Sequence, residues 1–151
     1  MTNETYTSPE PAPAPAPAPL SQGDERTWAM LAHLSVLVNF VTGFLGVLAA
    51  LIIYMVYKDR SRYVAYHSLQ ALVFQLIWWV GAGAVAGIAW AISGALSAIL
   101  IGLLCMPFAC LISLMPIAAP IYGIVGAVQT SQGQDFKYWL IGDWVRGTLE
   151  G

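Results

Sequence analysis

The sequence has few charged residues: Asp, Glu, Lys and Arg make up 9% of its 151 positions, against about 25% in an ordinary soluble domain. None occurs from Trp28 to Tyr57 or from Tyr63 to Gln134, and 58% of the residues are apolar. A soluble protein of this size needs a charged surface. The composition therefore excludes a soluble enzyme, a nucleic-acid binder and a disulfide-stapled secreted domain, and it predicts an integral membrane protein.

Cysteine and intramembrane acidic residues are also scarce. Cys105 and Cys110 stand five residues apart, which on a helix points them in different directions, so we expect free thiols. No Asp or Glu lies in the apolar segments that hold the two histidines, His33 and His67. Neither a catalytic triad nor a metal site with the usual number of ligands can then form in the membrane. We expect no enzymatic activity, no cofactor and no metal.

The chain divides into a tail and a membrane domain. In residues 1–23, prolines alternate with Ala or Glu from Pro9 to Pro19. Proline fixes φ and lacks a backbone donor, so we expect this tail to be a disordered, semi-rigid spacer. For residues 24–151 we expect an all-α membrane bundle of three long hydrophobic helices, the first of them either whole or broken into two.

Three apolar blocks predict these helices: residues 28–57, 63–92 and 95–129. As one helix the first block would be about 45 Å long, more than the ~30 Å hydrocarbon core. Thr42 and Gly43 interrupt it, so it is either one kinked span or two short helices that hardly cross a bilayer. Ser93-Gly94 is the expected turn after the second block. The prolines of the third block predict a long curved helix or a re-entrant element.

Basic residues lie between the first two blocks. Lys58, Arg60 and Arg62 are three of the six basic residues of the chain. By the positive-inside rule they place this loop in the cytoplasm, in a protein that crosses the inner (plasma) membrane several times. A single span in the first block would put the tail outside the cell. Two short helices would instead bring His33 and His67 together near the cytoplasmic side.

Small side chains in the second block predict close helix packing. They recur at four-residue spacing, which would let another helix approach, either within the chain or in a second copy. The row consists of Gly83, Gly87, Ala91 and Ala95.

Polar side chains within the blocks are expected to hold the bundle together by interhelical hydrogen bonds. Ligation of a haem or pigment, a proton relay and a polar channel lining are the alternatives. We expect His67 to be neutral and bonded across the bundle, with Gln70 as its local companion. We also expect the aromatic residues of the C-terminal stretch to anchor at the membrane interface. The six polar residues are His33, Ser35, Asn39, His67, Gln70 and Gln75.

Two motifs resemble a known family. Ala32-His33-Leu34-Ser35 stands in the first block, and His67-Ser68-Leu69-Gln70-Ala71-Leu72 lies in the second. With these motifs, residues 24–145 resemble a family of small bacterial membrane proteins of unknown function. That family is similar to the Tic-twenty-like proteins, components of the chloroplast inner-envelope translocon. The resemblance implies a bundle of three to four membrane helices, and it offers protein translocation as a distant analogy.

These observations favour a non-enzymatic membrane protein that acts through helix packing and protein partners, with a translocation-related role implied by the resemblance. An accessory subunit of a larger energy-transducing or photosynthetic membrane complex is one alternative, and a small channel or transporter is another. The expected partners are the lipid bilayer and either other membrane proteins or a second copy. No nucleic acid is expected.

Overall fold

The computed structural model describes residues 18–150, and every regular element in this part of the chain is helical. The all-α prediction is confirmed. Residues 1–17 of the predicted tail lie outside the described residues, and Gln22 and Gly23 already belong to the first helix. The helices are α1 (Gln22–Thr42), α2 (Leu45–Tyr57), α3 (Arg62–Leu76), α4 (Ala82–Leu96), α5 (Ile101–Ser113), α6 (Ala118–Ser131) and α7 (Gly142–Glu150).

Two continuous helices dominate the fold. A π-helical turn joins α3 to α4, so that Arg62–Ile99 is one helix of 38 residues, and Ile101–Ser131 returns beside it with 31 residues. Both are long and apolar enough to cross a membrane. The expected turn at Ser93-Gly94 is wrong, because the helix runs through it and the chain reverses at Leu100, whose φ is 65°.

The first block is broken into two helices. Gly43 separates α1 from α2 with a φ of 80°, a conformation that glycine adopts without strain. The chain folds back there, and the rings of Trp28 and Tyr57 at the two outer ends lie 4.7 Å apart. The first of the three long helices that we expected is therefore a pair of helices, of 21 and 13 residues.

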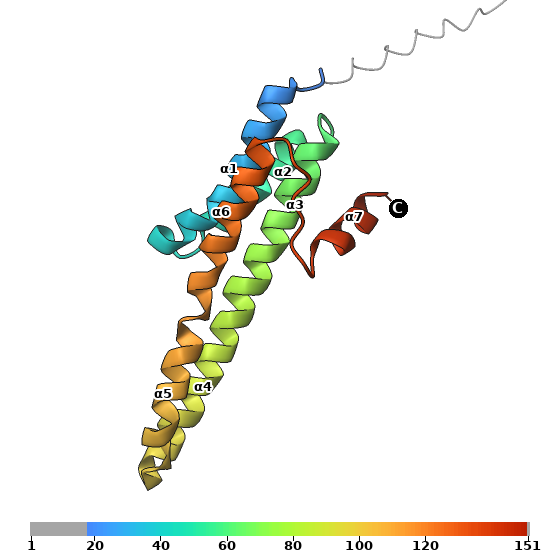
Figure 1. Ribbon diagram of the computed structural model, residues 1–151. Coiled ribbons are helices and arrows are strands. Elements are labelled where there is room, and N and C mark those ends of the chain that lie inside the picture. Colours follow the sequence, from blue (N-terminus) through green and yellow to red (C-terminus); the bar gives the residue numbers. More distant parts are fainter. Residues whose placement is uncertain (1–17, 151) are drawn as a thin grey trace, which may run out of the picture.

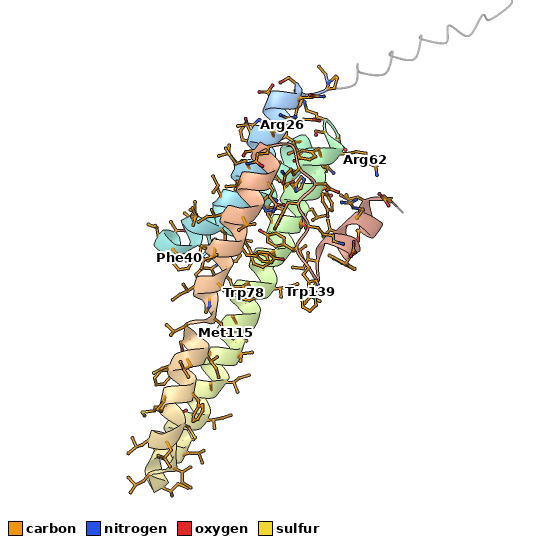
Figure 2. All side chains as sticks on the ribbon, viewed as in Figure 1. Arg26, Phe40, Arg62, Trp78, Met115 and Trp139 are labelled. Atoms are coloured by element: carbon orange, nitrogen blue, oxygen red, sulfur yellow. The ribbon has the colours of Figure 1, made fainter. Side chains whose placement is uncertain are left out.

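The molecule has a thick end and a thin end (Figure 1). We call residues 18–76 and 118–150 the bundle, in which α1, α2, α3 and α6 pack together, and residues 77–117 the arm, in which α4 and α5 continue as a helical pair. Helix α7 contacts α3, and in Figure 1 it lies on the opposite side of the bundle from the turn between α1 and α2. Apolar side chains cover the outside of the arm (Figure 2).

Candidate functional site

The bundle encloses a buried polar core that begins with the two histidines. His33 on α1 and His67 on α3 are both fully buried, and His33 Nε2 lies 3.3 Å from His67 Nδ1. His33 Nδ1 lies 3.0 Å from the hydroxyl of Tyr138, a residue of the segment that follows α6. Burial raises the pKa of the Tyr138 phenol, so its hydroxyl keeps its proton. The two histidines therefore meet, as we expected if the first block formed two helices instead of one span.

Gln70 clamps the C-terminal segment onto the bundle. Its Nε2 donates to the carbonyl oxygen of Phe136 at 3.1 Å, and its Oε1 accepts from the backbone N–H of Tyr138 at 2.6 Å. The Tyr138 ring stacks on Phe74 of α3 with the centroids 4.1 Å apart. Gln70 was expected beside His67, but it satisfies backbone groups of a segment 66 to 68 residues away.

A second group of hydrogen bonds fixes the α1–α2 turn. Asn39 Nδ2 donates to Gln75 Oε1 at 2.8 Å, and Asn39 Oδ1 accepts from the backbone N–H of Gly46 at 2.8 Å. Gln75 Nε2 donates to Ser35 Oγ, also at 2.8 Å. The three side chains are buried and bonded to one another. Such closed pairing favours bundle cohesion over a polar channel lining.

One imidazole nitrogen of the core is unpaired. Among the described residues three buried side-chain atoms have no hydrogen-bond partner, and they are His67 Nε2, Tyr66 Oη and Trp79 Nε1. In residues 18–150 there is also no group of three or more His, Cys, Asp or Glu side chains that could hold a metal ion. The arrangement can orient helices and hold the C-terminal segment, and it offers a single imidazole nitrogen for any further ligand.

The predicted row of small residues does not pack inside the chain. Gly83 and Gly87 lie on the outer face of the arm, where an added Cβ would meet no atom within 4 Å. The face of α4 turned toward α5 instead carries the more buried side chains Ala86 and Ser93. All four members of the predicted row are exposed, so the row follows the face of α4 that is turned away from α5. Packing of Gly83, Gly87, Ala91 and Ala95 between two copies stays a prediction.

Other glycines do pack closely, among them two on α6, Gly46 on α2 and Gly102 on α5. An added Cβ at Gly126 would lie 2.7 Å from Phe136 Cε1 and 3.0 Å from His33 Nδ1. At Gly123 it would lie 2.5 Å from Val36 Cγ1. Sequence reasoning missed these positions, although their three-residue spacing fits one helix face.

The charged residues of the described part of the chain fall into three zones, residues 24–26, 58–62 and 135–150, and these three charged zones meet at the bundle. Ser61 Oγ donates to Glu25 Oε1 at 2.6 Å, which ties the basic loop to the start of α1. Tyr63 Oη donates to the carbonyl oxygen of Gln134 at 3.0 Å, and an added Cβ at Gly133 would touch the Arg26 guanidinium. These contacts join the start of α1, the loop and first helical turn that follow α2, and the segment after α6. Figure 2 shows Arg26 and Arg62 at the same end of the molecule.

The C-terminal stretch combines buried and exposed aromatic residues. Phe136 and Tyr138 are buried in the bundle, so their predicted role as interface anchors is wrong. Trp139 and Trp144 are 79% and 61% exposed, and for them the prediction stands. The sequence does not distinguish the buried aromatic residues from the exposed ones, because both alternate with charged residues. In the structure, Gln70 binds the backbone of the buried pair, Phe136 and Tyr138.

Comparison with known proteins points to a family. Residues 24–145 match the MamF/MmsF profile, whose description is the magnetosome magnetite crystal formation protein family. This match overturns the resemblance to the Tic-twenty-like proteins and, with it, the translocation analogy. The two motifs that carried the resemblance supply His33, His67 and Gln70 to the buried core, so they indicate how the bundle packs. No curated protein and no solved structure matches the chain.

Proposed function

The chain belongs to the magnetosome magnetite crystal formation family, and we propose that it is a non-enzymatic protein of the magnetosome membrane with the three charged zones of residues 18–150 on one side. The arm and the adjoining halves of the two long helices cross the bilayer. The bundle presents the charged zones to other components of the membrane. The observation that carries this proposal is the meeting of the three zones at one end.

The contacts of the first block support this arrangement. If α1–α2 crossed the membrane, Glu25 and Ser61 would lie on opposite sides of a ~30 Å core, yet their side chains share a hydrogen bond. The bond from Tyr63 to Gln134 likewise puts the start of the first long helix and the end of the second on one side. The proposed topology is therefore two crossings, with α1–α2 entering and leaving on the same face.

The positive-inside rule assigns that face to the cytoplasm. All six basic residues lie in the charged zones of the bundle, and the far tip of the arm, residues 92–104, has no charged residue. A vesicle lumen on the far side would then face only the uncharged tip. We infer that the protein influences magnetite crystals through the membrane and through protein partners, rather than by holding mineral ions on charged side chains.

Thiol labelling in intact cells tests the topology. In a background with Cys105→Ala and Cys110→Ala, single cysteines replace the exposed residues Asp59 and Thr148 and the arm-tip residue Ser97, and an impermeant maleimide is added before or after lysis. We expect Asp59→Cys and Thr148→Cys to react only after lysis. Ser97→Cys, at the arm tip, should react from the opposite side. Labelling of Asp59→Cys and Thr148→Cys from different sides would refute the proposal.

Crystal growth supplies the functional readout. In magnetosome-forming cells that lack the gene, we expect the wild-type chain to restore crystal size, measured by electron microscopy. A chain with Lys58→Glu, Arg60→Glu and Arg62→Glu reverses the charge of the loop without touching the buried core. It should be inserted less uniformly and restore crystals poorly. If this variant inserts in both orientations and still restores crystal size fully, the proposal that the charged zones must share one side of the membrane is contradicted.

A further inference from the structure

We propose that the chain is a one-sided membrane wedge, which binds curved bilayers in preference to flat ones and places its bundle in the convex leaflet. The proposal rests on the proposed function in one respect, because it requires the charged zones to share a face. It adds an activity, the selection of membrane curvature, and names the partner as the lipid of one leaflet.

The wedge shape follows from the number of helices at each level. Four helices, α1, α2, α3 and α6, pack together at the thick end, whereas α4 and α5 alone form the thin end (Figure 1). A helix with its side chains is about 10–12 Å across, so each one takes about 80–110 Å² of a leaflet. The pair α1–α2 therefore adds roughly 200 Å² to one leaflet and nothing to the other.

The outer face of α1–α2 is built for acyl chains. Val41, Ile52 and Met55 are 88%, 60% and 63% exposed, and no charged residue occurs between Trp28 and Tyr57. Soluble proteins rarely expose so large a contiguous apolar surface to water, and such surfaces mark contacts with a membrane or a partner. The outer ends of α1 and α2 lie beside charged residues at the thick end. This arrangement fits a helix pair that inserts into the lipid from the charged side of the membrane and leaves its outer ends at that surface.

The depth of the pair is fixed by its contact with the long helix. Phe40, just before the turn, meets Trp79 with ring centroids 5.6 Å apart. Trp79 lies near the middle of the helix Arg62–Ile99. The pair thus ends halfway along the molecule, and the remaining half contains only the arm.

The length of the long helices predicts that the molecule tilts relative to the membrane normal. The uncharged run from Tyr63 to Ile99 would be about 55 Å long, against a ~30 Å hydrocarbon core, and such excess length is accommodated by tilting. Helix α7, with Asp143 and Arg146, and the apolar α1–α2 turn lie on opposite sides of the bundle (Figure 1). A tilt toward α1–α2 sinks the apolar pair into lipid and leaves α7 at the surface, where Trp144 can anchor it.

These features act in the same direction. Both the inserted pair and the surface helix add area to the leaflet on the charged side, and the thin arm adds little to the other leaflet. Insertion of this kind is more favourable where the receiving leaflet is stretched, which is its condition on the convex side of a curved bilayer. The charged end should therefore point outward on a small vesicle.

Reconstitution of the full chain tests this directly. The Cys105→Ala, Cys110→Ala chain with Asp59→Cys, at an exposed position of the basic loop, is placed in vesicles of equimolar phosphatidylcholine and phosphatidylglycerol, with diameters of about 50 nm and about 400 nm. An impermeant maleimide reports the fraction of molecules whose charged end points outward. We expect that fraction to rise several-fold relative to the inward fraction in the small vesicles, and to be close to even in the large ones.

Charge-matched variants separate the wedge from other effects. Val41→Asp puts a carboxylate at the exposed tip of the pair, where no packed side chain is disturbed, and should abolish the dependence on diameter by driving the pair out of lipid. Ser131→Asp puts the same charge at the exposed end of α6, outside both α1–α2 and α7, and should keep it. Ile52→Asp serves as a second variant, and thermal unfolding in detergent verifies that each variant is folded.

The outcomes distinguish this proposal from the topology beneath it. If Asp59→Cys and Thr148→Cys react together but their outward fraction is the same in both vesicle sizes, the wedge is refuted and the one-sided topology stands. An unchanged diameter dependence in both Val41→Asp and Ile52→Asp also refutes it. If the two cysteines react from opposite sides, the topology and the wedge fail together.

Discussion

The bundle and the arm are held together by different means. In the bundle, polar side chains such as Gln70 and Asn39 are fully buried and bonded between helices, and glycines of α6 bring backbones close together. In the arm the fully buried residues are small ones, Ser93, Gly102 and Ala109, and the large apolar side chains point outward. Gly102 of α5 is closely packed as well, because an added Cβ there would collide with the carbonyl oxygen of Ser93 on α4. The bundle therefore combines close packing with buried side-chain hydrogen bonds between helices, whereas the arm packs through small residues and exposes its large ones.

The largest expected effect comes from filling a glycine of the bundle. Gly126→Leu forces a side chain against Phe136 and His33, and it should lower the free energy of unfolding by about 3 kcal/mol. Gly87→Leu in the arm meets open space, and with its better helix propensity it should raise that free energy by up to about 1 kcal/mol. Thermal unfolding in mild detergent measures both.

A large loss in Gly87→Leu would break the comparison. It would mean that the outward row of the arm is itself a packing surface. Mass measurement of the detergent-solubilised protein would then show whether a second copy covers Gly83 and Gly87, and whether Gly87→Leu separates the copies.

The glycines also show what the sequence can and cannot predict. The break at Gly43 and the long uncharged helices were predictable, because a glycine in an apolar run and the absence of charge are local features. The reversal at Leu100 was not, since Ser93-Gly94 is the stronger local turn signal and helix pairing overrides it. Which small residues pack depends on the helix opposite, and that is not a local property.

The buried core shows the same division. The polar residues of the blocks were identified as interhelical partners, and the meeting of the histidines followed once the first block was treated as two helices. The partner of Gln70 lies 66 to 68 positions away, in a charged and aromatic stretch typical of an interface segment. No pattern within that stretch distinguishes Tyr138, which is buried, from Trp139, which is exposed.

Removing the Gln70 clamp should have the second largest effect. Gln70→Leu leaves the Phe136 carbonyl and the Tyr138 N–H unpaired, which should cost about 2 kcal/mol of the free energy of unfolding. The C-terminal segment should also be released, so that trypsin cuts faster at Lys137. Gln132→Leu, at an exposed position, is the matched control. Equal cleavage rates in both variants would show that Phe136 and Tyr138 hold the segment by packing alone.

The histidine pair should contribute less. His67→Leu leaves His33 Nε2 without its partner and should cost about 1 kcal/mol, whereas His67→Gln keeps a donor and an acceptor and should cost less. A double-mutant cycle with His33→Leu should give a coupling of about 0.6 to 1.7 kcal/mol. A purified protein with a Soret band that His67→Gln abolishes would instead assign the unpaired Nε2 to a haem.

The smallest effect is expected for a hydrogen bond within the arm. Trp90 Nε1 on α4 donates to Ser113 Oγ on α5 at 3.0 Å, and the indole is 43% exposed. Trp90→Phe removes the donor and keeps most of the apolar surface, and Ser113 can turn its hydroxyl to the carbonyl of Ala109, which it already contacts at 2.8 Å. Interhelical bonds of this kind average about 0.6 kcal/mol in membrane bundles, because the separated helices also find partners. We therefore expect a loss of about 0.5 kcal/mol from Trp90→Phe, the same from Ser113→Ala, and no more from both together. A loss as large as that of Gln70→Leu would mean that the arm, like the bundle, carries its own specificity and does not depend on lipid to hold its helices together.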